Sequence, residues 1–499
     1  MKTYDLIVIG TGAGNIVLDA ALAKGLKCAV IEKGRFGGTC LNRGCIPTKV
    51  LVTAADYLRQ IEELPAIGVI VGKATMDWPV ISRRVWEKIN ESKEVETYYQ
   101  TFSNLDIYRG EAFFVAEKTL KIRQTEGYTA EITAEKIVVD IGAQTKLPQV
   151  SGRDETGYLS SESLFGEKYP KQPFESLIII GGGPIGCEFA HIFSAAGTKV
   201  TLVQHNVRLL PKADEEVSAQ ILADMTKMGI NVHLNADLVE MSKEQGQKKL
   251  VFANRSTGQT TIIIAEEIMF ASGIEPVTER LQAAQGGLAL EHGGWIKTNE
   301  FLETNVAGVY AIGDVNGKAA FRHKANYEAE ILAHNLFEAQ EPRAWRWARY
   351  DLVPAVTFTY PQIAQVGMTE KEAQQQGYNI KIGKQFYSNT AKGYALGLTK
   401  QSDGFIKLIV DEATDNLLGV HIIGHEAALL LQPFINLMNA GEVQLKPINE
   451  EIASEPVKEL RKQEITRYLD PHKVQSISET MTPHPSLAEV AMWVQYYLK

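Results

Sequence analysis

The sequence predicts an α/β protein with more than one domain. Two apolar runs of strand length, at residues 5–9 and 177–180, each lead into a glycine-rich turn and then into a helical pattern. From about residue 350 the pattern changes to alternating polar and apolar residues, which is typical of antiparallel strands. A chain of 499 residues is also too long for one hydrophobic core. We therefore expect two Rossmann-like domains followed by an α+β domain.

The first glycine turn has the pattern of a dinucleotide-binding βαβ unit. Its glycines are Gly10, Gly12 and Gly14, and Asn15 stands where a third motif glycine is usual. The next apolar run, residues 28–31, ends in Glu32. Glycines let a pyrophosphate approach backbone N–H groups, and an acid at the second strand end can bind a ribose hydroxyl. The turn therefore predicts a dinucleotide site.

The second glycine turn is a complete G-x-G-x-x-G formed by Gly181, Gly183 and Gly186. The strand that follows, residues 199–203, ends at Gln204 rather than at an acid, and His205 and Arg208 come next. A missing carboxylate removes repulsion towards a 2′-phosphate, and Arg208 could pair with that phosphate. This favours NADPH over NADH. The alternative is that Gln204 binds the ribose hydroxyls and Arg208 is solvated.

A pair of cysteines lies between these two units, in the segment GGTCLNRGCIPTK at residues 37–49. Four residues separate Cys40 from Cys45, and a helical pattern follows with Pro47 in its first turn. Cys45 is therefore expected at a helix N-terminus, where a thiolate is favoured. Such a pair can open and close a disulfide against an external thiol. Spacing alone also allows an inert disulfide or two packing cysteines.

Composition and charge exclude several other functions. The formal charge is -9, and no basic stripe is present, which argues against nucleic acid as a partner. No apolar run reaches membrane-spanning length, and the N-terminus has no cleavable signal pattern. Only four cysteines occur, so we expect a cytoplasmic protein whose disulfide is catalytic. We expect packing roles for Cys28 and Cys187, and no metal site.

The cysteine segment resembles the redox-active segment of the class I pyridine nucleotide-disulfide oxidoreductases, over thirteen consecutive positions. Further family blocks recur in order, at residues 304–314 and 481–489. The resemblance implies FAD in the first unit, with Asp314 on the ribityl chain, and a nicotinamide cofactor in the second. It also implies a homodimer. Gly142, after an expected strand end, and Gly273 are further candidates for the cofactor sites.

The resemblance also implies catalytic roles. Cys45 would be the thiolate near the flavin, and Cys40 the thiol that exchanges with substrate. His484, held by Glu489, would be the acid–base catalyst for the neighbouring subunit's cysteines. Lys49 and Glu188 would pair beside the flavin and nicotinamide; the alternative is that both are ordinary surface charges.

The implied domains are residues 1–150 and 274–345 for FAD, 151–273 for NAD(P), and 346–499 for dimerisation. Two departures from the family pattern stand out. Asp140 and Ile141 replace the usual ATGA-like strand end. An insertion near residues 445–480 suggests either a helical excursion or lid at the dimer interface, which narrows the disulfide cleft, or a surface decoration.

Three functions remain open from the sequence. The motif GTGAGN, the run LLLQPFINLM and Gln204 look nearest to mycothione reductases, which favours reduction of a low-molecular-weight disulfide. Most other blocks fit dihydrolipoamide dehydrogenase equally well, with a dihydrolipoyl group on a carrier as the dithiol. A redox-sensing flavoprotein with little turnover is the third, and the full set of catalytic residue types argues against it.

Overall fold

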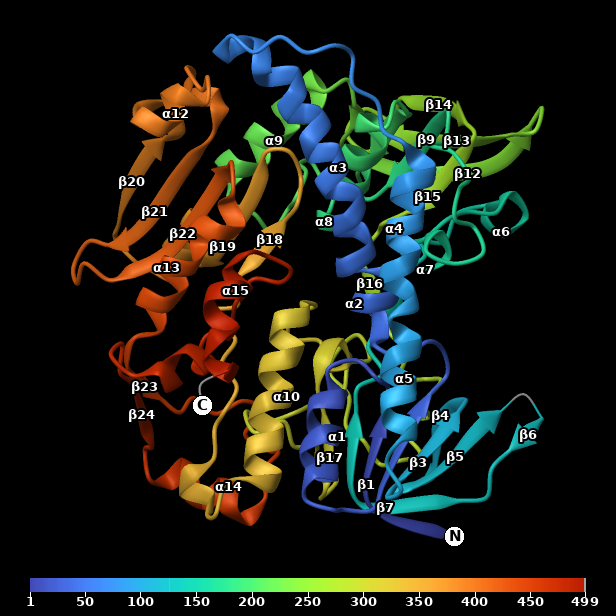
Figure 1. Ribbon diagram of the computed structural model, residues 1–499, viewed down its shortest axis with the longest axis vertical. Coiled ribbons are helices and arrows are strands. Elements are labelled where there is room, and N and C mark those ends of the chain that lie inside the picture. Colours follow the sequence, from blue (N-terminus) through green and yellow to red (C-terminus); the bar gives the residue numbers. More distant parts are fainter. Residues whose placement is uncertain (125, 498–499) are drawn as a thin grey trace.

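The computed structural model describes residues 1–124 and 126–497 and has the α/β architecture that the sequence predicts. Three bodies of sheet and helix follow one another, and the chain returns once to the first body before it enters the third (Figure 1). In the described part of the chain, no helix combines the length and apolar character that a membrane crossing requires.

The first body is built on a largely parallel sheet in the order β3-β2-β1-β7-β5-β4, with β17 paired to β7 and β6 paired to β5. Its inner strands are apolar on both faces, as a sheet covered by helices requires, and Leu6, Ile7 and Val8 are fully buried. The strands are β1 (Lys2–Ile9), β2 (Cys28–Glu32), β3 (Leu105–Arg109), β4 (Glu111–Ala116), β5 (Thr119–Gln124), β6 (Gly127–Tyr128), β7 (Ile132–Val139) and β17 (Val309–Ala311).

Helices α1 and α10 pack against each other beside this sheet (Figure 1). Helix α1 begins at Gly14, directly after the first glycine turn, and ends at Ala23. The strand β17 returns from far along the chain to pair with β7, which brings the segment that opens α10 to the same sheet edge. The helices are α1 (Gly14–Ala23), α2 (Gly38–Arg43), α3 (Cys45–Glu63), α4 (Trp78–Asn90), α5 (Ser92–Gln100) and α10 (Arg322–Phe337).

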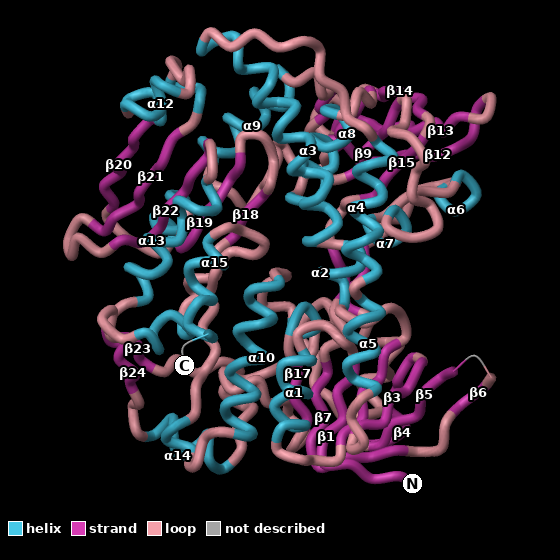
Figure 2. The backbone as a smooth tube through the Cα atoms, in the orientation of Figure 1, coloured by secondary structure: helices cyan, strands magenta, loops and turns pink. Residues whose placement is uncertain are grey.

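The second body has a four-stranded parallel sheet, β11-β10-β9-β15, and a three-stranded antiparallel sheet, β12-β13-β14 (Figure 2). The second glycine turn connects β9 to α8. The elements are α6 (Arg153–Thr156), α7 (Ser161–Leu164), β9 (Ser176–Ile180), α8 (Pro184–Ala195), β10 (Lys199–Val203), α9 (Glu215–Lys227), β11 (Asn231–His233), β12 (Ala236–Glu244), β13 (Gln247–Asn254), β14 (Thr260–Ala265) and β15 (Glu267–Phe270). A short ladder of β8 (Ala143–Thr145) with β16 (Ile274–Pro276) joins the two crossings between the bodies.

The third body is a five-stranded antiparallel sheet in the order β18-β19-β22-β21-β20. Alternate side chains of β21 are buried, which is the period-2 pattern of a sheet with one covered face. Its elements are β18 (Ala355–Thr357), β19 (Gln362–Gly367), α11 (Glu370–Gln375), β20 (Ile380–Phe386), α12 (Ala391–Ala395), β21 (Phe405–Asp411), β22 (Leu417–Gly424) and α13 (Ala427–Asn439).

The predicted insertion is one helix with a two-stranded ladder. Strand β23 (Gly441–Gln444) pairs with β24 (Thr466–Leu469), and α14 (Glu455–Lys462) lies between them in sequence. The excursion runs down beside the lower end of α10 and returns upward to α15 (Ala488–Trp493) (Figure 1). It therefore contacts the first body of its own chain.

Candidate active site

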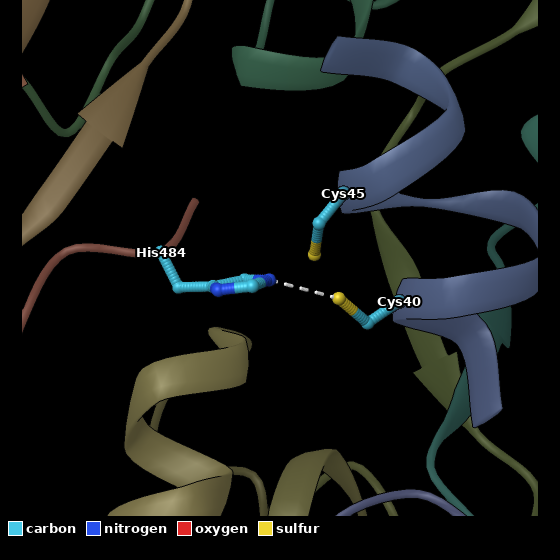
Figure 3. Close-up of side chains that lie close together, drawn as sticks. All are labelled: Cys40, Cys45 and His484. Carbon is cyan, nitrogen blue, oxygen red and sulfur yellow. Dashed lines mark hydrogen bonds between the residues drawn. The ribbon is translucent and has the colours of Figure 1, made fainter. Parts of the chain in front are cut away.

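The cysteine pair lies where two helices meet. Cys40 is on the short helix α2, Gly44 separates the two helices with φ −133° and ψ −116°, and Cys45 opens the long helix α3. The hydroxyl of Thr48 donates to the carbonyl of Gly44 at 2.6 Å, which ties the first turn of α3 together. Both cysteines are free thiols, and their sulfur atoms point towards each other and towards His484 (Figure 3).

His484 completes a chain of three groups with the cysteines. Its Nε2 lies 3.1 Å from Cys40 Sγ, and its Nδ1 lies 2.6 Å from Glu489 Oε1. Both sulfurs and the imidazole lie within 4.8 Å of one another. Burial lowers the pKa of His484, but hydrogen bonding to Cys45 and Glu489 outweighs burial and raises it to about 9. The imidazole therefore holds a proton beside the sulfurs at neutral pH.

The two thiols differ in acidity. The hydrogen bond between the sulfurs and burial raise the pKa of Cys40 well above its usual value. The same hydrogen bond holds the pKa of Cys45 well below its usual value despite burial, with help from His484 and Lys49. Cys45 is thus the thiolate, and Cys40 carries the shared proton. The position of Cys45 at the N-terminus of α3 also favours its thiolate form.

Within one chain, the imidazole of His484 contacts Cys40. The segment that precedes His484 docks on the first body before it reaches the histidine. The role of His484 towards the cysteines of the neighbouring subunit stays a prediction of the resemblance.

His323 was not recognised as a site residue from the sequence. Its Nδ1 accepts the backbone N–H of His484 at 3.3 Å, while its Nε2 lies 2.8 Å from the carbonyl of Pro354. Burial lowers the pKa of His323 to about 4, so the ring is neutral and can serve as an acceptor. A histidine that opens a predicted helix carries no sequence signal for this role.

Lys49 and Glu188 form the ion pair that the resemblance implied. Lys49 Nζ lies 2.7 Å from Glu188 Oε2, and both side chains are largely buried. The other carboxylate oxygen of Glu188 accepts the backbone N–H of Phe358, and the ammonium group lies 4.4 Å from the ring centroid of Phe358. The pair therefore connects α3, α8 and the start of the third body.

Two carboxylates accept hydrogen bonds from the first glycine turn and fix its conformation. Glu32 Oε2 accepts from the hydroxyl and the N–H of Thr11. Asp140 Oδ2 accepts the N–H of Gly14 at 2.7 Å, beneath the turn. A Cβ on Gly10 would lie 2.1 Å from the carbonyl of Asp140, so the turn needs glycine there. Burial raises the pKa of Asp140 to about 7.

Asp314 lies on the short helix Gly313–Asn316. A fully buried lysine fixes this helix: Lys324 Nζ donates to the carbonyl of Gly313 and to Asn316, and pairs with Glu328. Burial raises the pKa of Asp314 to about 6. Among the described residues its carboxylate has no hydrogen-bond partner, so it is suited to accept hydroxyl groups of a bound cofactor.

The second glycine turn is held by Gln204. Its carboxamide oxygen accepts the N–H of Gly182 at 3.0 Å, and its nitrogen donates to the carbonyl of Arg208. A Cβ on Gly186 would lie 1.8 Å from the carbonyl of Gly181, so the strand and helix can meet only through glycine. Gly183 precedes α8, while Gly142 and Gly273 have positive φ at the two crossings between the bodies.

The basic side chains after Gln204 already have partners. Arg208 Nη1 lies 3.0 Å from Glu215, and His205 Nδ1 lies 2.9 Å from Asp237. Glu215, His205 and Asp237 are more than half exposed, so water screens these pairs. A 2′-phosphate would compete with Glu215 for Arg208.

Two Rossmann-like units on either side of an acidified cysteine pair define a dithiol–disulfide oxidoreductase of the nucleotide-dependent class. Comparison with known proteins agrees with this class. A family model for pyridine nucleotide-disulphide oxidoreductases matches residues 4–329, and one for their dimerisation domain matches residues 353–462. The chain belongs to this family: it is an FAD-dependent enzyme that uses NAD(P)H, acts on sulfur groups and forms a homodimer.

Individual relatives cover most of the chain. A mycothione reductase of Mycobacterium tuberculosis (strain CDC 1551 / Oshkosh) is 33% identical over 447 residues, which is 88% of this chain and 94% of the relative. A dihydrolipoyl dehydrogenase of Chlorobaculum parvum is 32% identical over 433 residues, 86% and 89% of the two chains. The Cu(II) complex of the HOCl-induced flavoprotein disulfide reductase RclA from Escherichia coli aligns over 100% of both chains, with a TM-score of 0.75 and 26% identity.

Proposed function

We propose that the enzyme reduces a low-molecular-weight disulfide with electrons from NADPH, through Cys40 and Cys45. The observation that carries this proposal is the contact chain from Cys40 through His484 to Glu489, beside a Cys45 thiolate. The net reaction is NADPH, a proton and one disulfide giving NADP⁺ and two thiols. The similarity to mycothione reductase supports a disulfide of that general kind as substrate.

The protein groups would act in two exchange steps. Cys40 passes its proton to the Cys45 thiolate and attacks one sulfur of the substrate, and the thiolate that leaves takes the proton of the cationic His484. The neutral imidazole then removes the proton from Cys45. Cys45 then attacks the sulfur of Cys40, which restores the Cys40–Cys45 bond and releases the second thiol. Glu489 keeps the imidazole oriented and stabilises its cationic form.

FAD is assigned to the first glycine turn and the surface around Asp314. Residues that fit it are Gly10, Gly12, Gly14, Glu32, Gly142, Lys49 and Asp314. The glycine turn leads directly into α1, whose N-terminal N–H groups suit a pyrophosphate, and Asp314 offers a free acceptor. When bound there, FAD supplies two-electron transfer between the nicotinamide and the cysteine pair.

The nicotinamide cofactor is assigned to the turn formed by Gly181, Gly183 and Gly186, with Gly273 at the neighbouring crossing. NADPH is preferred because β10 ends without a carboxylate and Arg208 lies next to that end. We expect Arg208→Gln to lower kcat/KM for NADPH about tenfold, the value of one charge-assisted contact, and to change NADH little. Lys227→Gln, an exposed cation at the other end of α9, is the control. A wild-type preference for NADH would refute the assignment.

Two other functions are separated by direct assay. Oxidation of dihydrolipoamide with NAD⁺ is the reaction expected if the similarity to dihydrolipoyl dehydrogenase reflects the activity. Turnover of a panel of low-molecular-weight disulfides with NADPH, measured beside dihydrolipoamide with NAD⁺, decides between them. We expect the faster kcat/KM with a disulfide. A flavoprotein that turns over neither is the redox sensor.

The domain assignment follows the sheets. Residues 1–150 and 274–345 would hold FAD, 151–273 the nicotinamide cofactor, and 346–499 the dimer interface. Supporting this, β17 pairs with β7 of the first sheet, and residues 176–270 form the second body. We also propose a cytoplasmic location, because the four cysteines are all free thiols and a reducing compartment keeps a catalytic pair in turnover.

A further inference from the structure

We propose that Asp140 is a further residue of the FAD site and that its carboxyl holds a proton while the cofactor is bound. Asp140 and Ile141 stand where the family pattern has an ATGA-like strand end, and the exchange steps proposed above give Asp140 no part. The inference rests on the assignment of FAD to the first glycine turn. It does not depend on which disulfide or dithiol the enzyme uses.

Asp140 lies between the two segments that are assigned to FAD. It directly follows β7, whose last residue, Val139, pairs in parallel with Ile9 of β1 and with Ala311 of β17. The first glycine turn leaves the end of β1, and the short helix that carries Asp314 follows the end of β17. Ligands of such sheets bind beyond the carboxyl ends of the strands, so Asp140 is at the edge where the cofactor is expected.

Glycines on both sides make room for the Asp140 carboxyl. A Cβ on Gly12 would lie 2.8 Å from Oδ2, and a Cβ on Gly313 would lie 2.7 Å from Oδ1. The N–H of Gly14, at the start of α1, donates to Oδ2 at 2.7 Å. The carboxyl therefore fills the space between the first glycine turn and the short helix that begins at Gly313.

One oxygen of this carboxyl has no donor. The Asp140 residue is only 8% exposed, and within residues 1–124 and 126–497 its Oδ1 has no hydrogen bond. A buried carboxylate oxygen without a donor is costly, whereas a protonated oxygen can itself donate to an acceptor. A ligand that is rich in acceptor oxygens, such as a diphosphate, would satisfy a proton on Oδ1.

The charge of the cofactor determines which form of the carboxyl suits the site. The N-terminus of α1 favours an anion, and an Asp140 carboxylate would compete there with the ionised diphosphate of FAD. The turn already has a second acid, Glu32, which accepts from the hydroxyl of Thr11. Burial raises the pKa of Asp140 to about 7 in the chain by itself. A bound diphosphate should raise this pKa further, because like charges in one buried site disfavour ionisation.

The charged groups of the neighbouring helices do not remove this conflict. Asp314 and Glu328 add negative potential at the Asp140 carboxyl, and the positive charge of Arg322 does not offset burial. Lys324 pairs with Glu328 at 3.2 Å, and both side chains are fully buried. The cation nearest to these acids is therefore already engaged, and a proton is the remaining way to neutralise Asp140.

The infrared spectrum of the holoenzyme detects the proton directly. With FAD bound at about pH 8, wild type should show the C=O band of a protonated carboxylic acid that shifts in D₂O and is absent from Asp140→Asn. Asparagine has nearly the shape of the neutral acid, and its amide can donate where the O–H does. A difference spectrum between the two holoenzymes that contains only a carboxylate band would overturn the proposal.

The retention of FAD tests the coupling between proton and cofactor. Holoenzyme is diluted at several pH values, and the released FAD is measured by its fluorescence. Because binding takes up one proton, the dissociation constant of wild type should rise with pH above 7, by up to about tenfold per pH unit. The constant for Asp140→Asn should not change with pH. A slope that survives in this variant would contradict the proposal.

Two further variants assign the slope to one carboxyl. Asp314 is the other buried acid of the FAD surface, and burial raises its pKa to about 6. Asp314→Asn should hold FAD more weakly but keep the wild-type slope, and loss of the slope in this variant would overturn the assignment to Asp140. Asp140→Ala, which restores the first residue of the ATGA-like strand end, should abolish the slope as Asp140→Asn does.

These measurements need no disulfide substrate. Failure of every disulfide and dithiol in the assay panel would defeat the proposed function and leave the protonation of Asp140 untouched. A holoenzyme that reduces disulfides but shows neither the protonated carboxyl nor the pH-dependent release of FAD would defeat this inference alone.

Discussion

Cys40 and Cys45 face each other, yet their surroundings divide the work between them. Cys45 has the helix N-terminus, Lys49 and a shared proton on its side, which stabilise a thiolate. Cys40 is the sulfur that Nε2 of His484 reaches directly. At the scale of single residues, the thiol next to the acid–base group is the one suited to attack substrate.

His484 predicts a specific pH profile. The pKa of its imidazole is raised from the usual 6.5 to about 9 in the folded protein. The folded protein therefore keeps the imidazole proton at neutral pH and loses it as pH rises through about 9. We expect the rate of disulfide reduction to fall above pH 9. His484→Gln should lower kcat/KM by about 10²–10⁴ and remove this alkaline limb, because no proton remains to give. A variant that kept the limb would show that another group is responsible.

Asp140 predicts a pH-dependent stability. Burial, with a smaller effect of Asp314, raises the pKa of its carboxyl to about 7 in the folded state. The hydrogen bond from the N–H of Gly14 and the charge of Arg322 lower this pKa but do not offset burial. The unfolded chain ionises earlier, so stability is lost as pH rises from about 4 to 7. Asp140→Asn should raise the thermal midpoint of the flavoenzyme. The gain in the free energy of unfolding should grow from pH 5 to pH 8, towards at most about 4 kcal/mol. An equal gain at both pH values would contradict the assignment.

At the scale of elements, the sequence predicted the features that depend on short local patterns. The two glycine turns and the helix that begins at Cys45 follow from motifs of a few residues each. The pairing of Lys49 with Glu188 came from the family resemblance. The place of His323 and the contact of Asp140 with Gly14 could not be read, because both depend on packing between segments more than a hundred residues apart.

Residues 441–483 form the segment whose integrity should set the position of His484. Arg461→Met leaves Glu300 buried without its partner, a loss of about 3–5 kcal/mol. We expect the rate of disulfide reduction to fall about tenfold and the alkaline limb of its pH profile to shift. The rate of NADPH oxidation with an artificial electron acceptor, which takes electrons at the flavin, should be unchanged.

The matched control for this prediction replaces both partners. Glu300→Gln combined with Arg461→Met removes the uncompensated charge and should restore much of the activity. If the single variant lost both activities equally, the segment would support the whole fold rather than the histidine.

At the scale of the whole molecule, three bodies meet at the cysteines. Glu188 from the second body binds Lys49 of the first and the backbone of Phe358 at the start of the third. The sequence predicted this assembly through its family blocks. Residues 441–483 hold His484 close to the first body, because their partners Glu300 and Phe301 lie in that body. A contact across 444 positions has no local signal.

The most direct measurement for the enzyme as a whole is an anaerobic titration of the flavoenzyme with NADPH. If Cys40 and Cys45 exchange electrons with the cofactor, each wild-type subunit takes up about four electrons, two in the flavin and two in the cysteine pair. Cys45→Ser should take up two. A wild-type subunit that is complete after two electrons, with both thiols already free and unresponsive, would contradict the account.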